Sequence, residues 1–224
     1  MYRFETHVHS AEVSRCGRVP AAEMVGLYKA AGYSGLCLTD HINPWTFMDL
    51  DLPTWEDKVT HFLKGYHAAK EAAGEDFTVL LGAEFHFHEN NNDYLVYGLT
   101  EDILYGLGGD ILDWGIAKFS PFCRENGLLL MQAHPFRNSM VVNKPDVVDG
   151  IEVMNGHPRH DSRNFIARAW AEHYGLLMSS GSDAHERGDQ ARGGLLTEKP
   201  ITSLEELIAE IRKGAKLIIP EDQQ

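Results

Sequence analysis

The 224-residue sequence has few cysteines and no arrangement of them that suits a structural metal. Cys16, Cys37 and Cys123 are odd in number and scattered, and none belongs to a Cys-x-x-Cys pair. We therefore expect three reduced thiols, with neither a disulfide framework nor a cysteine-based zinc site.

Long apolar runs are also missing. No stretch approaches the roughly 18 apolar residues that a membrane span needs, and residues 1–7 lack the basic start and apolar run of a secretion signal. We expect a cytoplasmic protein that has no membrane partner.

Positive charge is scarce. Lys and Arg total 20 against 33 Asp and Glu, which gives a net charge of -13. Such a balance disfavours binding to duplex nucleic acid through a basic surface. A small phosphorylated substrate stays compatible, because bound divalent cations can supply positive charge locally.

Several nucleotide-binding and hydrolase motifs are absent as well. The sequence has no Gly-x-Gly-x-x-Gly or Gly-x4-Gly-Lys after a predicted strand, and no Gly-x-Ser-x-Gly. Nucleotide-cofactor and serine-hydrolase functions are therefore disfavoured.

Apolar or alternating segments typical of strands do occur, and they alternate with amphipathic segments typical of helices. The predicted strands are residues 2–9, 35–39, 77–83, 94–97, 128–133, 150–154 and 176–180. The predicted helices are residues 21–31, 55–73, 111–126, 161–174 and 204–213. This order predicts an α/β fold with a mainly parallel sheet, either a barrel or an open sheet. With no linker or repeat, we predict a single domain over residues 1–224.

Ionisable residues accompany the first predicted strand. His7 and His9 are two residues apart, so their side chains would leave the same face with Cα atoms roughly 6.6 Å apart, within reach of one metal ion. Taken alone, this pair suits a structural role equally well.

The pattern recurs where later strands end. Asp40-His41 follows the second strand, Glu84 the third and Asp183-Ala184-His185 the last. In parallel α/β folds the carboxyl ends of the strands meet at one rim, so these side chains would converge. The candidate ligands are His7, His9, His41, Glu84, His134, Asp183 and His185.

This ligand set indicates a catalytic centre with more than one ion. Imidazole and carboxylate groups suit Zn, Mn or Fe. Seven candidates exceed what one ion needs, so we predict two or three divalent ions that share a bridging carboxylate. Such a centre can polarise a phosphoryl oxygen and hold a metal-bridging hydroxide as nucleophile.

These motifs resemble those of the polymerase and histidinol phosphatase (PHP) family, and they occur in the same order along the chain. The matching segments are His7-Val8-His9-Ser10, Thr39-Asp40-His41, Gly82-Ala83-Glu84, Ala133-His134-Pro135-Phe136 and Gly181-Ser182-Asp183-Ala184-His185. The resemblance implies a distorted (β/α)7 barrel, a trinuclear metal site at the carboxyl rim and phosphoesterase activity.

The resemblance also implies how the ligands are shared among three ions. The implied ligands are His7, His9, Glu84 and Asp183 for the first ion, Glu84 and His134 for the second, and His41 and His185 for the third.

Two positions depart from the family pattern. Shortly after the opening motif, where the family has His or Asp, Glu12 is the nearest possible ligand, although a solvated loop carboxylate is an equal alternative. Asp93 stands where a further family histidine is usual. His86 and His88 would share a face with Glu84 at strand periodicity, so they offer a rival source of ligands. We favour Asp93.

Candidate substrate contacts lie near the same rim. Arg137 has a planar, always charged group that matches phosphate oxygens. Asn155 and His157 follow the strand at residues 150–154 and could contact substrate, and His157 could donate a proton. A polar loop cap is the alternative for these two residues.

The sequence therefore predicts a metal-dependent hydrolase acting on a phosphate ester, namely a small phosphorylated metabolite, a nucleotide or a short oligonucleotide. An amidohydrolase, which shares the opening HxH and a late Asp, is one alternative. A non-catalytic metal-binding module is another. The ending Asp183-Ala184-His185 favours the phosphoesterase, and the seven retained ligands argue against a decayed site. Oligomeric state is not specified.

Overall fold

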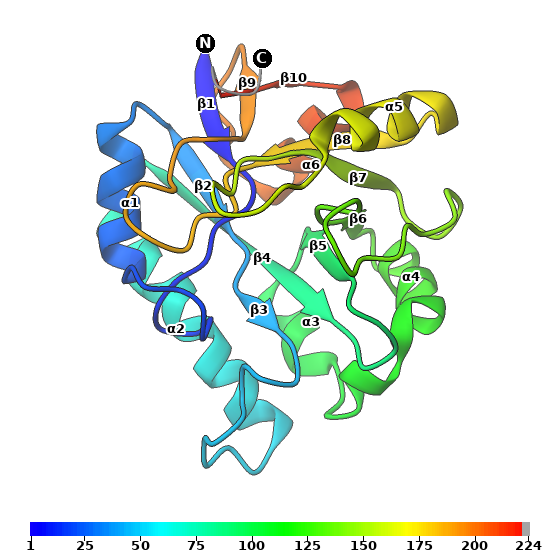
Figure 1. The fold of residues 1–224 in the computed structure, drawn as a ribbon. Helices are drawn as coiled ribbons and strands as arrows, with labels where there is room; N and C mark the ends of the chain where they lie inside the picture. Colours follow the sequence, from blue (N-terminus) through cyan, green and yellow to red (C-terminus); the bar gives the residue numbers. More distant parts are fainter. Residues whose placement is uncertain (221–224) are drawn as a thin grey trace.

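The computed structural model describes residues 1–220, and within them one mixed sheet is flanked by helices (Figure 1). The strands are β1 (Tyr2–Glu5), β2 (Gly35–Leu38), β3 (His41–Ile42), β4 (Thr78–His86), β5 (Asp93–Tyr97), β6 (Leu129–Gln132), β7 (Gly150–Asn155), β8 (Leu177–Gly181), β9 (Leu195–Thr197) and β10 (Lys216–Leu217). The helices are α1 (Ala21–Ala30), α2 (Trp55–Ala73), α3 (Glu101–Gly106), η1 (Ile111–Asp113), α4 (Gly115–Glu125), α5 (Asn164–Tyr174) and α6 (Leu204–Lys213).

Local sequence signals set the helix ends. Thr54 and Asp57 form a capping box at the start of α2, which gives that helix the predicted bounds. Gly214 ends α6 in the left-handed conformation. Among residues 1–220, none of the helices combines the length and hydropathy needed to cross a membrane.

The sheet curls into a nearly closed barrel. Its strand order is β10-β9-β1-β2-β4-β5-β6-β7-β8, and β3 pairs with β4. The closing contact lies just beyond β1 and β8, where the Asp183 amide donates to the His7 carbonyl (2.8 Å) and the His9 amide donates to the Ala184 carbonyl (3.1 Å). The predicted α/β barrel is thereby confirmed.

The sheet is less parallel than the sequence predicts. β5 runs antiparallel to both β4 and β6. The reason is the short connection at residues 87–92, because a parallel return needs a crossover of about a dozen residues. The structure also contains β3, α3, β9 and β10, which were not predicted, and β1 ends at Glu5 rather than residue 9.

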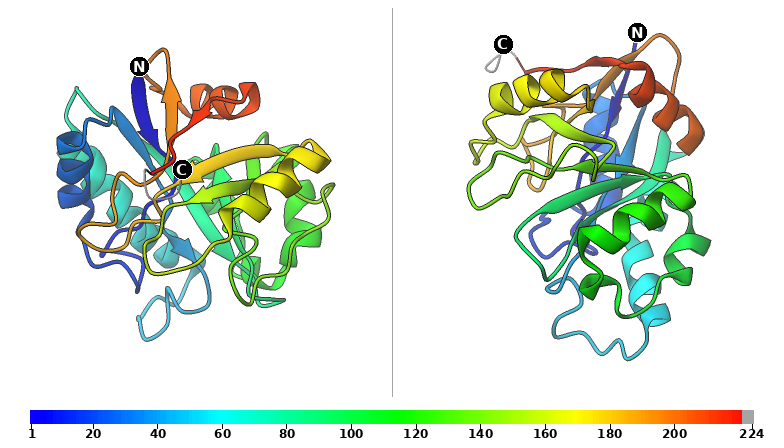
Figure 2. Two further views of the ribbon diagram at one scale, coloured as in Figure 1. Left: turned by 45° about the horizontal axis from the view of Figure 1, so that its top comes forward. Right: turned by 90° about the vertical axis from the view of Figure 1, so that its right-hand side faces the viewer.

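Apolar side chains fill the barrel below the carboxyl ends of its strands. Phe4, Cys37, Leu95 and Leu129 belong to one buried cluster, which α6 joins through Leu207. Helices α1 and α2 contact each other, and α2 contacts β4, while α5 contacts β7 and β8. Figure 2 shows these helices outside the sheet. The carboxyl rim is thus left to the loops that carry the polar residues.

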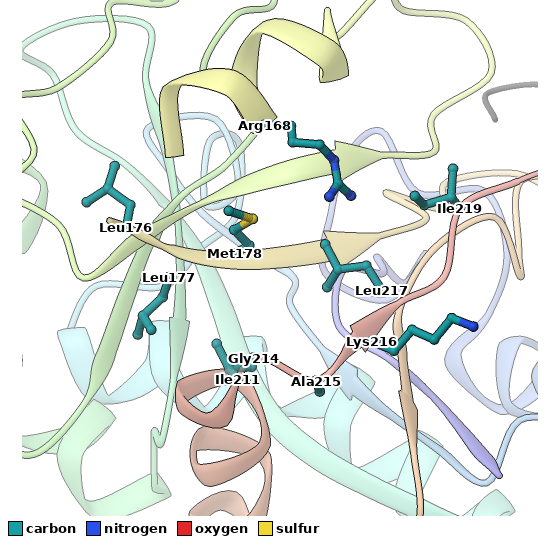
Figure 3. A pocket seen from close by; sticks show the side chains of 10 residues that line it. All are labelled: Arg168, Leu176, Leu177, Met178, Ile211, Gly214, Ala215, Lys216, Leu217 and Ile219. Carbon is teal, nitrogen blue, oxygen red and sulfur yellow. The ribbon is translucent and has the colours of Figure 1, made fainter. Parts of the chain in front are cut away.

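A cavity of about 460 Å³ lies at the amino end of β8, between β8 and β10 (Figure 3). Its lining is mainly aliphatic, including Met178 and Leu217, and its charged residues are Arg168 and Lys216. Because none of the lining residues within residues 1–220 is a His, Asp or Glu, this cavity is not the predicted metal site.

Candidate metal centre

The structure brings all seven candidate ligands named above together at the carboxyl rim. β3 places His41 directly opposite Glu84 of β4 in the parallel register. His134 follows β6, and the segment after β8 carries Asp183 and His185. Three overlapping groups of possible ligand atoms result, each with all its atoms within 4.8 Å of one another.

The first group is His7, His9 and Glu84, with Asp183 alongside. The Nε2 atoms of His7 and His9 are 3.1 Å apart. Asp183 Oδ1 lies 3.4 Å from His7 Nε2 and 3.3 Å from His9 Nε2. These are the four residues that the family resemblance implies for the first ion.

The second group is Glu84, Asp93 and His134. His134 Nε2 is 3.2 Å from Glu84 Oε1 and 3.8 Å from Asp93 Oδ2. His86 Nδ1 lies instead 2.8 Å from Asp93 Oδ1, outside the group, so it holds the carboxylate in place. His88 is half-exposed and faces Asp113. The geometry thus favours Asp93 over both histidines.

The third group is His9, His41 and His185. The ring of His9 stacks between those of His41 and His185, with centroid separations of 4.3 and 4.4 Å. Glu12 lies apart from all three groups. Both of its carboxylate oxygens accept from the Ala21 amide at the start of α1 (3.1 and 2.9 Å), so it caps that helix.

The donor spacing fits divalent ions. Metal to ligand distances of about 2.1 Å place neighbouring ligand atoms about 3.0 to 3.4 Å apart in octahedral or tetrahedral geometry. Separations within the first group run from 3.1 to 3.4 Å. Glu84 Oε1 and His41 Nδ1 are moreover buried without a hydrogen-bond partner in the described structure, although both face this cluster. Bound cations would satisfy such atoms.

The pKa values of His7 and His9 are shifted in opposite directions. Burial disfavours a charged His7, but the carboxylates of Asp183, Glu152 and Glu84 outweigh it and hold the pKa of His7 well above 6.5. Burial lowers the pKa of His9 well below that value, and His41 and His185 lower it further. His9 is thus a neutral ligand at neutral pH.

The carboxylates of Glu84 and Asp183 stay ionised although both are buried. Burial alone would raise the pKa of Glu84, but the charges of His7 and His41 and the close approach of the His134 imidazole hold it well below its usual value. For Asp183, His7, His9 and Arg137 likewise outweigh burial and lower the pKa. Both groups are therefore ready to bind cations.

Glu152 of β7 orients two of the ligands from behind. Its Oε1 lies 2.9 Å from His7 Nδ1, and its Oε2 accepts from the His134 amide at 3.1 Å and from Asn155 Nδ2 at 2.9 Å. A carboxylate on the remote nitrogen of a ligand histidine fixes its tautomer and its ring orientation. Glu152 is fully buried, so this contact is shielded from water.

Replacing Glu152 by glutamine is expected to weaken metal affinity about tenfold to a hundredfold. Glutamine keeps the volume of the side chain but has no negative charge. It also offers only one acceptor oxygen, whereas the carboxylate offers two. Chelator competition with Mn²⁺ measures the change. Glu101→Gln is the control and should leave the affinity unchanged, because this side chain is 45% exposed and faces His67 outside the three ligand groups. Equal affinity in both variants would contradict the orienting role.

The backbone around the cluster is locally strained. His134 and Asp183 have positive φ angles of 28° and 50°, although neither is glycine. Such conformations are held only where the surrounding structure imposes them, often at functional sites. Gly181 contributes a close approach, because a Cβ there would lie 2.3 Å from His7 Cβ and 2.9 Å from Glu152 Oε1.

The three groups open into a cleft of about 350 Å³. Its lining residues are Cys16, Arg18, His41, Glu84, Asp93, His134, Arg137, His157, Arg159, His160, Asp183, His185 and Glu186. Arg137 and His157, two of the three predicted substrate contacts, therefore lie beside the metal groups. The third, Asn155, contacts the cluster because its Nδ2 donates to Asp183 Oδ2 (3.1 Å).

Several contributing residues were not identified from the sequence. Glu152 had a usable signal, a single acidic residue inside the apolar segment 150–154. Arg18 and His160 had none, because they reach the cleft from loops whose paths the sequence pattern does not define.

Comparisons with known proteins agree with this geometry. The family model described as PHP-associated matches residues 161–215, which include Asp183 and His185. No curated protein matches the sequence.

Solved structures share the fold. PsfC from Pseudomonas syringae is 17% identical, with a TM-score of 0.70 over 99% of this chain and 93% of its own. A two-domain Bacteroides vulgatus protein containing a predicted PHP-like metal-dependent phosphoesterase is 18% identical, with a TM-score of 0.60 over 82% of this chain and 52% of its own. A Chromobacterium violaceum amidohydrolase with bound sulfate and no metal is 16% identical, with a TM-score of 0.55 over 98% of each chain.

The fold and the three groups of possible ligand atoms define an α/β barrel with a candidate metal centre at its carboxyl rim. The PHP-associated match over residues 161–215 is in line with the resemblance of the sequence motifs to the PHP family.

Proposed function

We propose that this chain is a metal-dependent phosphoesterase that hydrolyses a phosphate ester of a small metabolite, a nucleotide or a short oligonucleotide. The observation that carries the proposal is the set of three ligand groups, joined through Glu84 and His9, at a cleft that also holds Arg137. The family match and the phosphoesterase named in the Bacteroides protein support the coarser conclusion, a metal-dependent hydrolase.

The ligand groups would hold two or three divalent ions, with Zn, Mn and Fe all suited to imidazole and carboxylate donors. Bound divalent ions supply Lewis-acid charge to a phosphoryl group and make water a nucleophile at neutral pH. Glu84 belongs to two groups and would hold neighbouring ions at a fixed spacing.

Arg137 can bind the phosphoryl group directly. Its guanidinium donates to Asp183 Oδ2 at 2.7 Å and to Asn155 Oδ1 at 3.0 Å, which fixes its plane at the edge of the cleft. Burial opposes its charge, but Asp183 more than compensates and raises the pKa of Arg137. A fixed, permanently charged donor favours the extra negative charge of a phosphoryl transition state.

His157 lies in the cleft as a neutral imidazole. Burial, together with His185 and Arg137, lowers its pKa to about 4 even though Asp183 opposes the shift. The imidazole is therefore neutral at neutral pH, and in this form its ring nitrogens can exchange hydrogen bonds with a bound substrate.

The direct test is hydrolysis of an aryl phosphate and a panel of mononucleotides by the protein loaded with Mn²⁺ or Zn²⁺. We expect turnover that is abolished by chelation. Asp183→Asn should lower the turnover about a hundredfold or more, and the control Glu101→Gln should leave it unchanged. Absence of metal-dependent hydrolysis from every substrate would refute the proposal.

An amidohydrolase is the second candidate, favoured by the fold shared with the Chromobacterium protein. Amidohydrolase barrels commonly use a ligand lysine, whereas no lysine lines the described cleft. Cleavage of cyclic amides without phosphatase turnover would reverse the order of the two. Metal binding without either activity would indicate a non-catalytic module.

A further inference from the structure

A second cavity, of about 390 Å³, adjoins the metal cleft and shares Cys16, His41 and Asp93 with it. Its other lining residues are Arg15, Asn43, Trp45, Thr46, His86, Asn91 and Met140. Its volume lies within the range of small-molecule sites. Because the two spaces share walls, a substrate whose phosphoryl group lies at the ligand groups would extend its remaining part into this cavity.

Trp45 presents a large aromatic surface in this cavity. The residue is 49% exposed, although an indole usually buries most of its area. The centroid of its ring lies 5.0 Å from that of His86, which lines the same cavity and is held in place by its contact with Asp93. The contact with His86 therefore links the indole to Asp93 of the second ligand group.

A short turn fixes Trp45 relative to the metal ligands. Buried Asn43 accepts from the Trp45 and Thr46 amides (2.9 and 2.8 Å) through its side-chain Oδ1. The Thr46 hydroxyl donates to the His41 carbonyl at 3.0 Å. The position of the indole is thus tied to a candidate ligand four residues earlier, so the spacing between the ring and the metal groups is built into the chain.

We infer that this cavity is a leaving-group subsite for phosphate monoesters whose alcohol carries a flat aromatic or heteroaromatic ring, which stacks on Trp45. The inference rests on the proposed function and names its substrate class. Stacking on an aromatic side chain accepts any flat ring, since every such ring has a π face. Asn91 lies in the same lining and offers hydrogen bonds to ring heteroatoms, while Arg15 donates to the Trp45 and Met48 carbonyls and so holds the loop that carries the indole.

The test compares kcat/KM for phenyl phosphate, adenosine monophosphate and glycerol 2-phosphate in the Mn²⁺-loaded protein. We expect the wild-type protein to prefer the two ring substrates. Trp45→Ala should lower the ratio of ring to glycerol kcat/KM about tenfold, and Trp45→Phe should restore most of it. Met48→Ala is the control, because Met48 is 46% exposed on the same loop but does not line the cavity.

Two outcomes overturn the subsite and leave the proposed function intact. One is hydrolysis of all three esters with no preference for a ring. The other is a preference that Trp45→Ala leaves unchanged.

A binding measurement separates failure of the subsite from failure of the chemistry. If no ester is hydrolysed, the proposed function fails, and adenosine alone then serves as the probe. Quenching of tryptophan fluorescence by adenosine should be strong in the wild-type protein, largely lost in Trp45→Phe and absent with glycerol. Equal quenching by adenosine in both proteins would overturn the subsite.

Discussion

Replacing Glu84 by glutamine is expected to lower phosphate-ester hydrolysis about a thousandfold, which corresponds to about 4 kcal/mol of transition-state stabilisation. Glu84 is the carboxylate common to the first and second ligand groups. The amide keeps the shape of the side chain but removes the charge that would hold two cations side by side. Metal content should fall together with activity, because both groups lose their anionic member.

The choice of glutamine distinguishes the loss of a metal ligand from the loss of the folded structure. Glu84 is 1% exposed, so a larger change could disturb the core, whereas glutamine preserves its volume. Thermal unfolding of the chelated proteins checks this, and Glu101→Gln supplies the surface control. Activity within threefold of wild type at full metal content would contradict the central position of Glu84.

Metal affinity is expected to fall about tenfold for each pH unit below the pKa of His7, since a metal ion must displace the proton of that ring. The pKa of His7 lies well above 6.5, because Asp183, Glu152 and Glu84 together outweigh the cost of burial. In the metal-free protein this raised pKa gives stability that is complete below pH 6.5 and is lost as the pH rises through the folded value. The metal-loaded protein should show the reverse and lose stability as the pH falls.

Calorimetric titration of Mn²⁺ in two buffers of different ionisation enthalpy measures the displaced proton. Release of about one proton from His7 is expected at neutral pH. Glu152→Gln should reduce that release, because it removes one of the carboxylates that raise the pKa of His7. Metal binding with no proton release and a flat affinity from about pH 6 to about pH 8 would contradict the account.

The candidate ligands could be grouped from the sequence because each of them lies at or near the carboxyl end of a strand, and in this fold those ends meet at one rim. Residues that follow buried parallel strands reach the same rim, so His41, Glu84 and Asp183 could be grouped before any contact was known. The period of two within a strand also identified His86 as a neighbour of Glu84. It did not reveal that His86 would face Asp93 across the β4 and β5 pair, because that contact depends on register.

Other features depended on tertiary contacts that the pattern does not contain. Glu12 resembled a ligand by chemistry and position, yet the nearby start of α1 offers its carboxylate a backbone amide. The direction of β5 followed from the length of one connection rather than from its own apolar pattern. Glu152 belongs to the site only because the approach of β8 at Gly181 brings His7 against it.

Anomalous diffraction from crystals grown with Mn²⁺ or Zn²⁺ tests the multinuclear centre most directly. We expect at least two peaks, one about 2.1 Å from the Nε2 atoms of His7 and His9 and another beside His134, with Glu84 between them. A single peak, or peaks away from Glu84, would contradict the proposed centre.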